Sequence, residues 1–165
     1  MPQTLLTPVM VDTIERYFVA LQGHATAEVM LEDILTPDFR TGFVDGLVWR
    51  GPDGLSEFIE ARSEFFDESH EIRQISDPWP LPDGRWSART VLWFFLRRRE
   101  PAAPVSEEFT GLAFHRWEFE PSAQRSGWRV AAQLVEGFAR LNDNARILFG
   151  RPEDGLTTNP RSPTS

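Results

Sequence analysis

Residues 107–120 read EEFTGLAFHRWEFE, and this alternating run decides the expected fold class. On an extended chain, successive side chains point to opposite faces. The runs at 86–99 and 128–141 alternate in the same way, and three such runs in succession predict a long antiparallel meander. The expected inward face of run 107–120 is Phe109, Gly111, Ala113, His115, Trp117 and Phe119, and that of run 128–141 is Trp128, Val130, Ala132, Leu134, Glu136 and Phe138.

Helical patterns precede the meander. A first helix is expected to begin at Thr7-Pro8, with threonine as N-cap and proline in the first turn, and to end at Gln22-Gly23. Thr26 can cap a second helix that extends to about Leu35, and Gly51-Pro52-Asp53 opens a third. The N-terminal half of the chain is therefore predicted to be largely helical.

Shorter extended segments complete the expected fold. Residues 39–44 and 47–50 predict a hairpin, and residues 70–76 predict a further strand. Helices first and a meander afterwards are typical of an α+β fold. We expect a strongly curved antiparallel sheet packed on the N-terminal helices, with an internal pocket between them. Residues 1–149 would form this single domain, and residues 150–165, rich in Pro, Thr, Ser and Gly, a flexible tail.

The composition excludes several kinds of chemistry. The chain has 165 residues, 41% hydrophobic and 25% charged, which is typical of a globular protein. It has no cysteine, and all 17 of its cationic residues are arginine, so thiol and lysine Schiff-base mechanisms are excluded. A net charge of -8 disfavours binding to nucleic acid or anionic membranes. No run approaches the roughly 20 apolar residues of a membrane span, and no signal peptide is evident, so we expect a cytoplasmic protein.

Two polar residues on apolar faces are candidate catalytic groups. Tyr17, the single tyrosine, lies on the apolar face of the first predicted helix, where its hydroxyl could donate to an oxyanion or to a leaving hydroxyl. The alternative is a core tyrosine that is hydrogen-bonded to the backbone. His115 lies between Ala113 and Trp117, where a neutral imidazole could act as a general base or serve as a bonded core histidine.

Two further titratable residues and several aromatic rings complete the candidate site. His70 begins the strand at 70–76, and the alternative is a surface histidine. Glu136 could orient a histidine or act as a base with a raised pKa, or it could form a salt bridge with Arg89. The histidine spacing is not that of a zinc site, and we expect neither a metal nor a cofactor. The rings expected to line the pocket are Trp93, Trp117, Phe119, Phe138 and Phe43.

Four segments carry a resemblance to a known superfamily. They are ERYFVALQGH at 15–24, LEDILTPDF at 31–39, WRGPDGLSEFI at 49–59 and GWRVAAQLVEGFARLNDNARILFG at 127–150. Their order is similar to that of nuclear-transport-factor-2-like proteins, and among them the SnoaL-like domains. The resemblance implies a cystatin-like cone with an internal pocket. It also implies kinship with dehydratases, isomerases and polyketide cyclases, and with non-catalytic members of the superfamily.

The resemblance assigns roles residue by residue. Tyr17 matches a catalytic tyrosine on the first helix, and His70 matches a histidine of the dehydratases. His115 corresponds roughly to an oxyanion-hole position, and Glu136 resembles a last-strand carboxylate. Two departures follow: Phe43 stands near the position of the isomerase base, and Gln22 replaces the aspartate that the dehydratases pair with their tyrosine.

We therefore expect a cofactor-independent enzyme that dehydrates, isomerises or cyclises a hydrophobic aromatic or polycyclic molecule. His70 or His115 would be the base, and Tyr17 would stabilise the oxyanion. The alternative is a non-catalytic ligand-binding or dimerisation module, and the resemblance implies a homodimer in either case. A histidine base predicts an ionisation between about pH 5 and 8, whereas simple apolar binding predicts a nearly flat pH profile.

Overall fold

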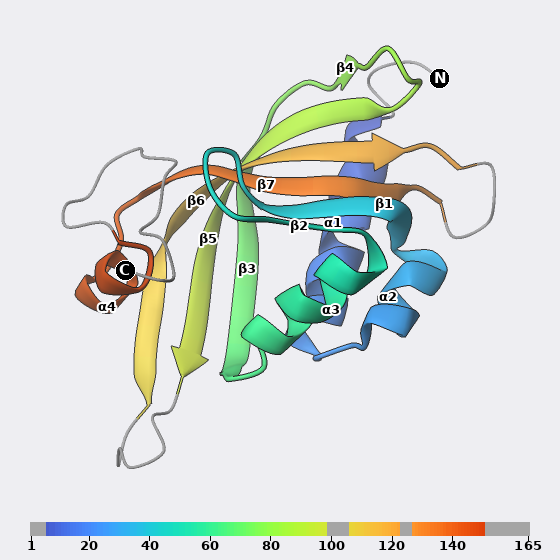
Figure 1. The fold of residues 1–165 in the computed structure, drawn as a ribbon. Helices are drawn as coiled ribbons and strands as arrows, with labels where there is room; N and C mark the ends of the chain where they lie inside the picture. Colours follow the sequence, from blue (N-terminus) through green and yellow to red (C-terminus); the bar gives the residue numbers. More distant parts are fainter. Residues whose placement is uncertain (1–5, 99–105, 123–126, 151–165) are drawn as a thin grey trace.

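The computed structural model describes residues 6–98, 106–122 and 127–150 (Figure 1). Helices and strands follow one another in the order expected of an α+β chain. In chain order the elements are α1 (Leu6–Gln22), α2 (Ala27–Asp33), β1 (Leu35–Phe43), β2 (Val48–Arg50), α3 (Gly51–Ala61), β3 (Phe65–Ile75), β4 (Trp79–Pro80), β5 (Trp86–Arg98), β6 (Glu107–Glu120), β7 (Arg129–Ala139) and α4 (Asp143–Leu148).

The strands form a mixed sheet and not a wholly antiparallel one. Its strand order is β2-β1-β7-β6-β5-β3, with the short β4 paired to β5. β1 and β7 run parallel, whereas the other pairs are antiparallel. Parallel neighbours need a long connection, and here everything from β2 to β6 lies between them. The prediction of an all-antiparallel sheet was wrong on this point, because local alternation does not show which strand joins the edge of the meander.

The local signals placed most boundaries within a few residues. Thr26 caps α2 by accepting a hydrogen bond from the Val29 backbone N–H, and a proline lies in the first turn of α3. α2 ends at Asp33, before the expected Leu35, because Leu35 already belongs to β1. β3 begins at Phe65, ahead of the predicted start at His70, and α4 was not predicted.

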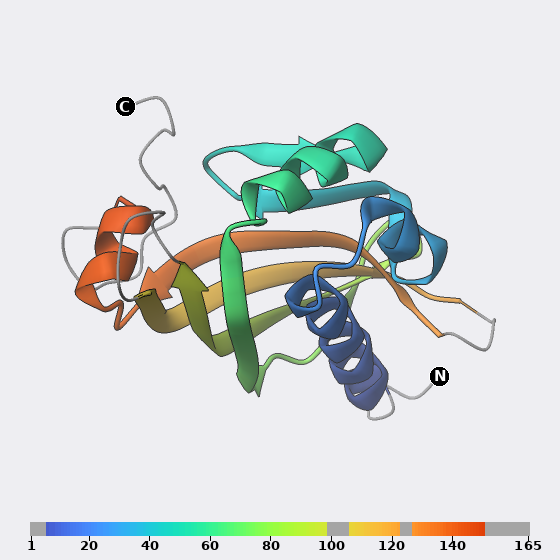
Figure 2. The same cartoon turned by 90° about the horizontal axis from the view of Figure 1, so that it is seen from below.

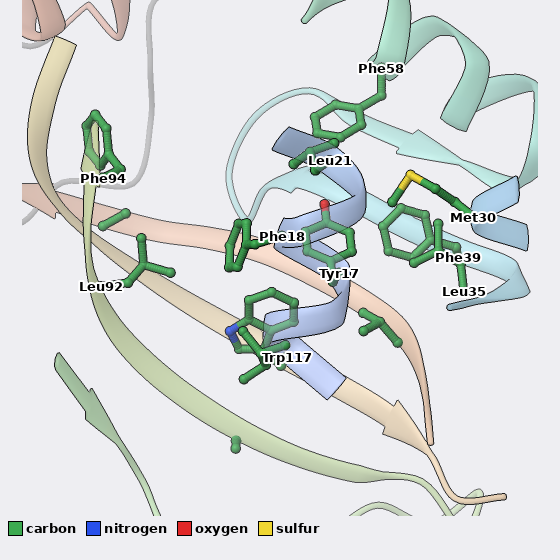
Figure 3. Packing of buried hydrophobic residues seen from close by; sticks show 14 of the residues in the cluster. Tyr17, Phe18, Leu21, Met30, Leu35, Phe39, Phe58, Leu92, Phe94 and Trp117 are labelled. Atoms are coloured by element: carbon green, nitrogen blue, oxygen red, sulfur yellow. The ribbon is translucent and has the colours of Figure 1, made fainter. Parts of the chain in front are cut away.

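Helices α1 and α3 pack on the sheet and enclose the core. α1 contacts β3 and β7, α3 contacts β1 and β2, and α4 contacts β6 at the end of the sheet opposite α2 (Figures 1 and 2). Tyr17 and Phe18 project from α1 onto Trp117 of β6, with ring centroids 5.5 and 5.7 Å from the indole (Figure 3). The core therefore lies between α1 and the inward face of the meander.

Two β-bulges change the inward face of β7. Its register against β6 shifts at Phe119/Glu118 and again at His115/Phe114, which leaves Ala131 and Glu136 without a partner in the ladder. Each extra residue reverses the alternation that follows it. The shared face predicted for run 128–141 is therefore wrong in its middle. The β7 residues that pair with inward residues of β6 are Val130, Gln133, Val135 and Phe138.

Two further expectations concern the C-terminal tail and membrane-spanning helices. Beyond Gly150, the tail predicted for residues 150–165 lies outside the described residues. Within the described ranges, no helix combines the length and apolar character needed to cross a membrane.

Candidate functional site

A cavity of about 120 Å³ lies between α1, α3 and the inward face of the sheet. For comparison, a dry apolar cavity of about 150 Å³ accommodates benzene, so this one has the size of a single aromatic ring. Most of its wall is apolar, and its polar side chains come from β1, β3, β6, β7 and the residue that follows α3. They are Thr41, Arg62, His70, His115 and Gln133.

His115 lies on the cavity wall because it belongs to the inward face of β6. Its Nδ1 lies 3.2 Å from the Gln133 amide nitrogen. An amide NH₂ can only donate, so Nδ1 accepts and the neutral ring carries its proton on Nε2. Burial lowers the pKa of His115 to about 3. The ring is therefore a neutral hydrogen-bond donor at pH 7.

His70 reaches the same cavity from β3. The Gln22 amide, at the end of α1, donates to its Nδ1 at 2.9 Å. Phe18 stacks on the imidazole with centroids 4.0 Å apart. Burial holds the pKa of His70 well below its usual value, and the charges of Arg62 and His115 act in the same direction. His70 is thus a second neutral imidazole beside the first.

Gln133 is the residue that connects these groups, and sequence reasoning missed it. Its Oε1 accepts hydrogen bonds from the Thr41 hydroxyl at 2.8 Å and from the Tyr17 hydroxyl at 3.2 Å, while its NH₂ donates to His115. Strict alternation pointed Gln133 outward, and the bulge at Ala131 turns it inward. The available signal was an amide within the otherwise apolar stretch VAAQLV, at residues 130–135.

Tyr17 lies behind the cavity wall and does not line it. The side chain is completely buried, and burial raises the pKa of its hydroxyl to about 12. The hydroxyl donates to Gln133, so it reaches His115 only through that amide. A direct contact between Tyr17 and a ligand, as expected from the sequence, does not follow from this geometry.

Arg62 supplies the positive charge at the cavity. It follows α3 directly and forms an ion pair with Glu68, whose side chain is 0% exposed. Burial lowers the pKa of Arg62 to about 10, so the guanidinium remains charged at pH 7. Arg62 and Glu68 together place a compensated charge pair beside two neutral imidazoles.

Glu136 does not belong to this site. As a bulge residue it leaves the alternation of β7, and its carboxylate accepts from Arg89 Nε at 2.8 Å. The salt bridge that the sequence allowed as the alternative is therefore the observed arrangement. Glu136 is absent from the cavity wall, which corrects the assignment of a catalytic carboxylate there.

The expected aromatic lining is found only in part. Phe43 and Phe138 line the cavity. Trp117 and Phe119 are fully buried in the core but do not reach it. Trp93 alternates with the inward-facing Leu92 and so lies on the opposite face of β5, which corrects its assignment to substrate binding. Among the described residues, no three His, Asp or Glu side chains are grouped so that they could hold a metal ion.

Phe149 is expected to set the size of the ligand. It lines the cavity just after α4 and stacks on Phe138 with centroids 4.4 Å apart. Removing its ring in Phe149→Ala should shift relative affinity from benzene towards naphthalene by about tenfold or more, because the second ring gains buried apolar area. Binding titrations of both hydrocarbons measure the shift. Phe95→Ala, outside the cavity lining, is the matched control, and an equal shift there would contradict this role.

The comparisons with known proteins show a shared fold at low identity. No family model and no curated protein matches the sequence. Among solved structures, a candidate scytalone dehydratase of Novosphingobium aromaticivorans is 13% identical with a TM-score of 0.62, and the match covers 97% of each chain. A nuclear transport factor 2-like superfamily protein of Salmonella enterica is 16% identical with a TM-score of 0.55, covering 82% of this chain and 94% of that one.

A further neighbour specifies the fold by name. It is a nuclear transport factor 2-like protein with a cystatin-like fold from Novosphingobium aromaticivorans, 18% identical with a TM-score of 0.52, and the match covers 83% of this chain and 84% of that one. Similarity at this level of identity establishes the fold alone. The chemistry has to be argued from the residues of the site. The structural neighbours of this chain are nuclear transport factor 2-like proteins, and the chain has their cystatin-like fold.

Proposed function

We propose that the cavity binds a small aromatic ketone and catalyses proton transfer at the carbon next to the carbonyl, without a cofactor. The observation that carries this proposal is the pair of neutral imidazoles, His70 and His115, on one apolar wall beside the Arg62 guanidinium. Dehydration, isomerisation and cyclisation all proceed through such a step. The name of one structural neighbour, a candidate scytalone dehydratase, agrees with this reaction class.

His115 is the electrophilic partner in this proposal. Its Nε2–H would donate to the substrate carbonyl oxygen and stabilise the enolate that forms when the neighbouring C–H bond breaks. A neutral imidazole can play this part, as in enzymes where a lowered histidine pKa keeps the ring uncharged. The mostly apolar wall strengthens this hydrogen bond because the local dielectric is low.

His70 is the proton acceptor. Rotation of the Gln22 amide would let its oxygen accept from Nδ1–H, which leaves Nε2 of His70 with a free lone pair. That nitrogen takes the proton as the electron pair of the C–H bond moves onto the carbonyl oxygen. The imidazolium is disfavoured by burial and by Arg62, so it returns the proton. Return to the same carbon gives exchange, and delivery to another carbon of a conjugated enolate gives isomerisation. Transfer to a β-hydroxyl releases water as the enolate electrons form the C=C bond and the C–O bond breaks.

Proton exchange in D₂O tests this assignment without knowledge of the natural substrate. We expect the protein to accelerate deuterium incorporation into the methyl group of acetophenone, and His70→Asn to lower the rate by about 10²–10⁴-fold. NMR of the ketone measures the rate. His24→Asn, in the exposed loop after α1, is the matched control and should retain full activity.

The pH dependence provides a second check. The sequence predicted an ionisation between about pH 5 and 8 for a histidine base. Because burial, Arg62 and His115 lower the pKa of His70, we now expect the exchange rate to stay level through the ordinary histidine pKa of 6.5 and to fall only in more acidic solution. A bell-shaped profile centred near neutrality would contradict the assignment of His70.

The alternative is a binding module that holds the same ligand without turnover. It is favoured by one observation: among the described residues, no carboxylate lines the cavity. In that case acetophenone would bind, and its methyl protons would exchange no faster than in buffer. The homodimer implied by the resemblance remains a prediction for either function, and light scattering of the full chain tests it.

A further inference from the structure

We infer that Gln133, held in place by Tyr17 and Thr41, locks His115 in the tautomer that is protonated at Nε2, so that the cavity recognises its ligand through an acceptor oxygen. The tautomer is a property of the free protein. The choice of ligand deepens the proposed function and rests on it. Tyr17 and Thr41 are positioning residues in this arrangement, because both act on His115 through Gln133.

The lock is the fixed orientation of the Gln133 amide, and it follows from the two hydroxyls that donate to the amide oxygen. Thr41 and Tyr17 are 1% and 0% exposed, and both donate to the same amide oxygen. If the amide were reversed, its nitrogen would donate to both oxygens. One of the two neighbouring hydroxyls could then donate to the other, but the second buried hydroxyl hydrogen would need a new acceptor. The observed orientation gives both hydroxyls an acceptor and places the NH₂ against Nδ1 of His115. Nδ1 must then accept, which assigns the ring proton to Nε2.

Gln22 holds His70 in a looser way. It is only half-buried, and among the described residues no hydroxyl donates to its side-chain oxygen. Its amide can therefore rotate, whereas that of Gln133 cannot. Two histidine–glutamine pairs of the same chemistry thus differ in freedom: His70 can use either tautomer, and His115 is restricted to one. This difference suits His70 to accept a proton and His115 to act as a hydrogen-bond donor.

The lock also restricts what can bind. Within the described residues, Nε2 of His115 has no protein acceptor, and it is not sealed from the cavity. A ligand oxygen can satisfy it, and the positive charge of Arg62 on the same wall favours an oxygen that carries or develops negative charge. Aromatic ketones, enols and phenolates fit this requirement. An aromatic amine of the same size presents mainly N–H donors, which cannot accept a hydrogen bond from the Nε2–H of His115.

Nitrogen NMR of the histidine-labelled protein tests the lock directly. At pH 7 we expect a single neutral tautomer of His115, protonated at Nε2, and the same signature in Thr41→Ser, which keeps the hydroxyl. Thr41→Val combined with Tyr17→Phe should cause loss of the single-tautomer pattern and add an Nδ1–H population. Thr41→Val alone provides the measurement if the double variant does not fold. An Nδ1–H tautomer or an imidazolium in the wild type would overturn the inference.

A pair of isosteric probes tests the ligand class. Acetophenone and α-methylstyrene differ in C=O against C=CH₂, so their affinities isolate the acceptor oxygen. We expect acetophenone to bind about 2- to 10-fold more tightly, the value of one neutral hydrogen bond, and His115→Phe to remove the preference. Equal affinities in the wild type would refute the ligand assignment. A preference for acetophenone without deuterium exchange would instead refute the proposed function and leave this inference standing.

Discussion

Arg62→Met is expected to lower the free energy of unfolding by about 3–5 kcal/mol, because it leaves the buried carboxylate of Glu68 without its positively charged partner. Glu68 is 0% exposed and is paired with Arg62, which is itself 18% exposed at the side chain. Both residues also hold a buried polar atom with no hydrogen-bond partner, so the pair is poorly solvated even when intact. Removing the cation leaves Glu68 without the charge that offsets its desolvation. Equilibrium denaturation in urea measures the loss.

The matched control breaks an exposed pair. Arg89 is 57% exposed in its bridge to Glu136, so Arg89→Met should cost about 1 kcal/mol or less. Arg62→Met combined with Glu68→Leu should recover much of the lost stability, since two apolar side chains replace the buried charges together. A single Arg62→Met variant as stable as Arg89→Met would show that solvent reaches Glu68 and would refute its burial.

Acidification from about pH 6.5 to pH 4.5 is expected to destabilise the fold steeply. The pKa of His115 is about 3 in the folded protein against an ordinary 6.5, and that of His70 is lowered as well. Below the ordinary value the unfolded chain binds protons that the folded chain does not, so stability present above pH 6.5 is lost as the pH falls. Each such histidine contributes a slope of about 1.4 kcal/mol per pH unit.

The histidine origin of this slope can be separated from that of the carboxylates. His115→Asn should remove about half of the pH dependence, whereas His24→Asn should leave it unchanged. The pKa of Asp38, lowered to about 2 by Arg85, affects stability only in more acidic solution. Urea denaturation of the three proteins at several pH values gives the slopes. Equal slopes for the wild type and His115→Asn would contradict a buried, neutral His115.

Sequence alone determined the elements whose signals are local. Thr26 as a cap, proline in the first turn of α3 and the alternation of run 107–120 gave helices and strands close to their observed bounds. The alternation also placed His115 on the inward face, and the resemblance directed attention to His70. These features could be read because each depends on neighbours within a few residues.

Only the tertiary structure decided how those groups work together. The parallel pairing of β1 with β7 brings Thr41 beside Gln133, and the bulge at Ala131 turns that glutamine inward. The bulge at Glu136 moves its carboxylate to Arg89 and out of the cavity. A bulge arises where the register between two strands shifts, and register is a property of both strands at once. The sequence therefore determined which side chains were available, and strand register decided that an amide, and not a carboxylate, holds the histidine.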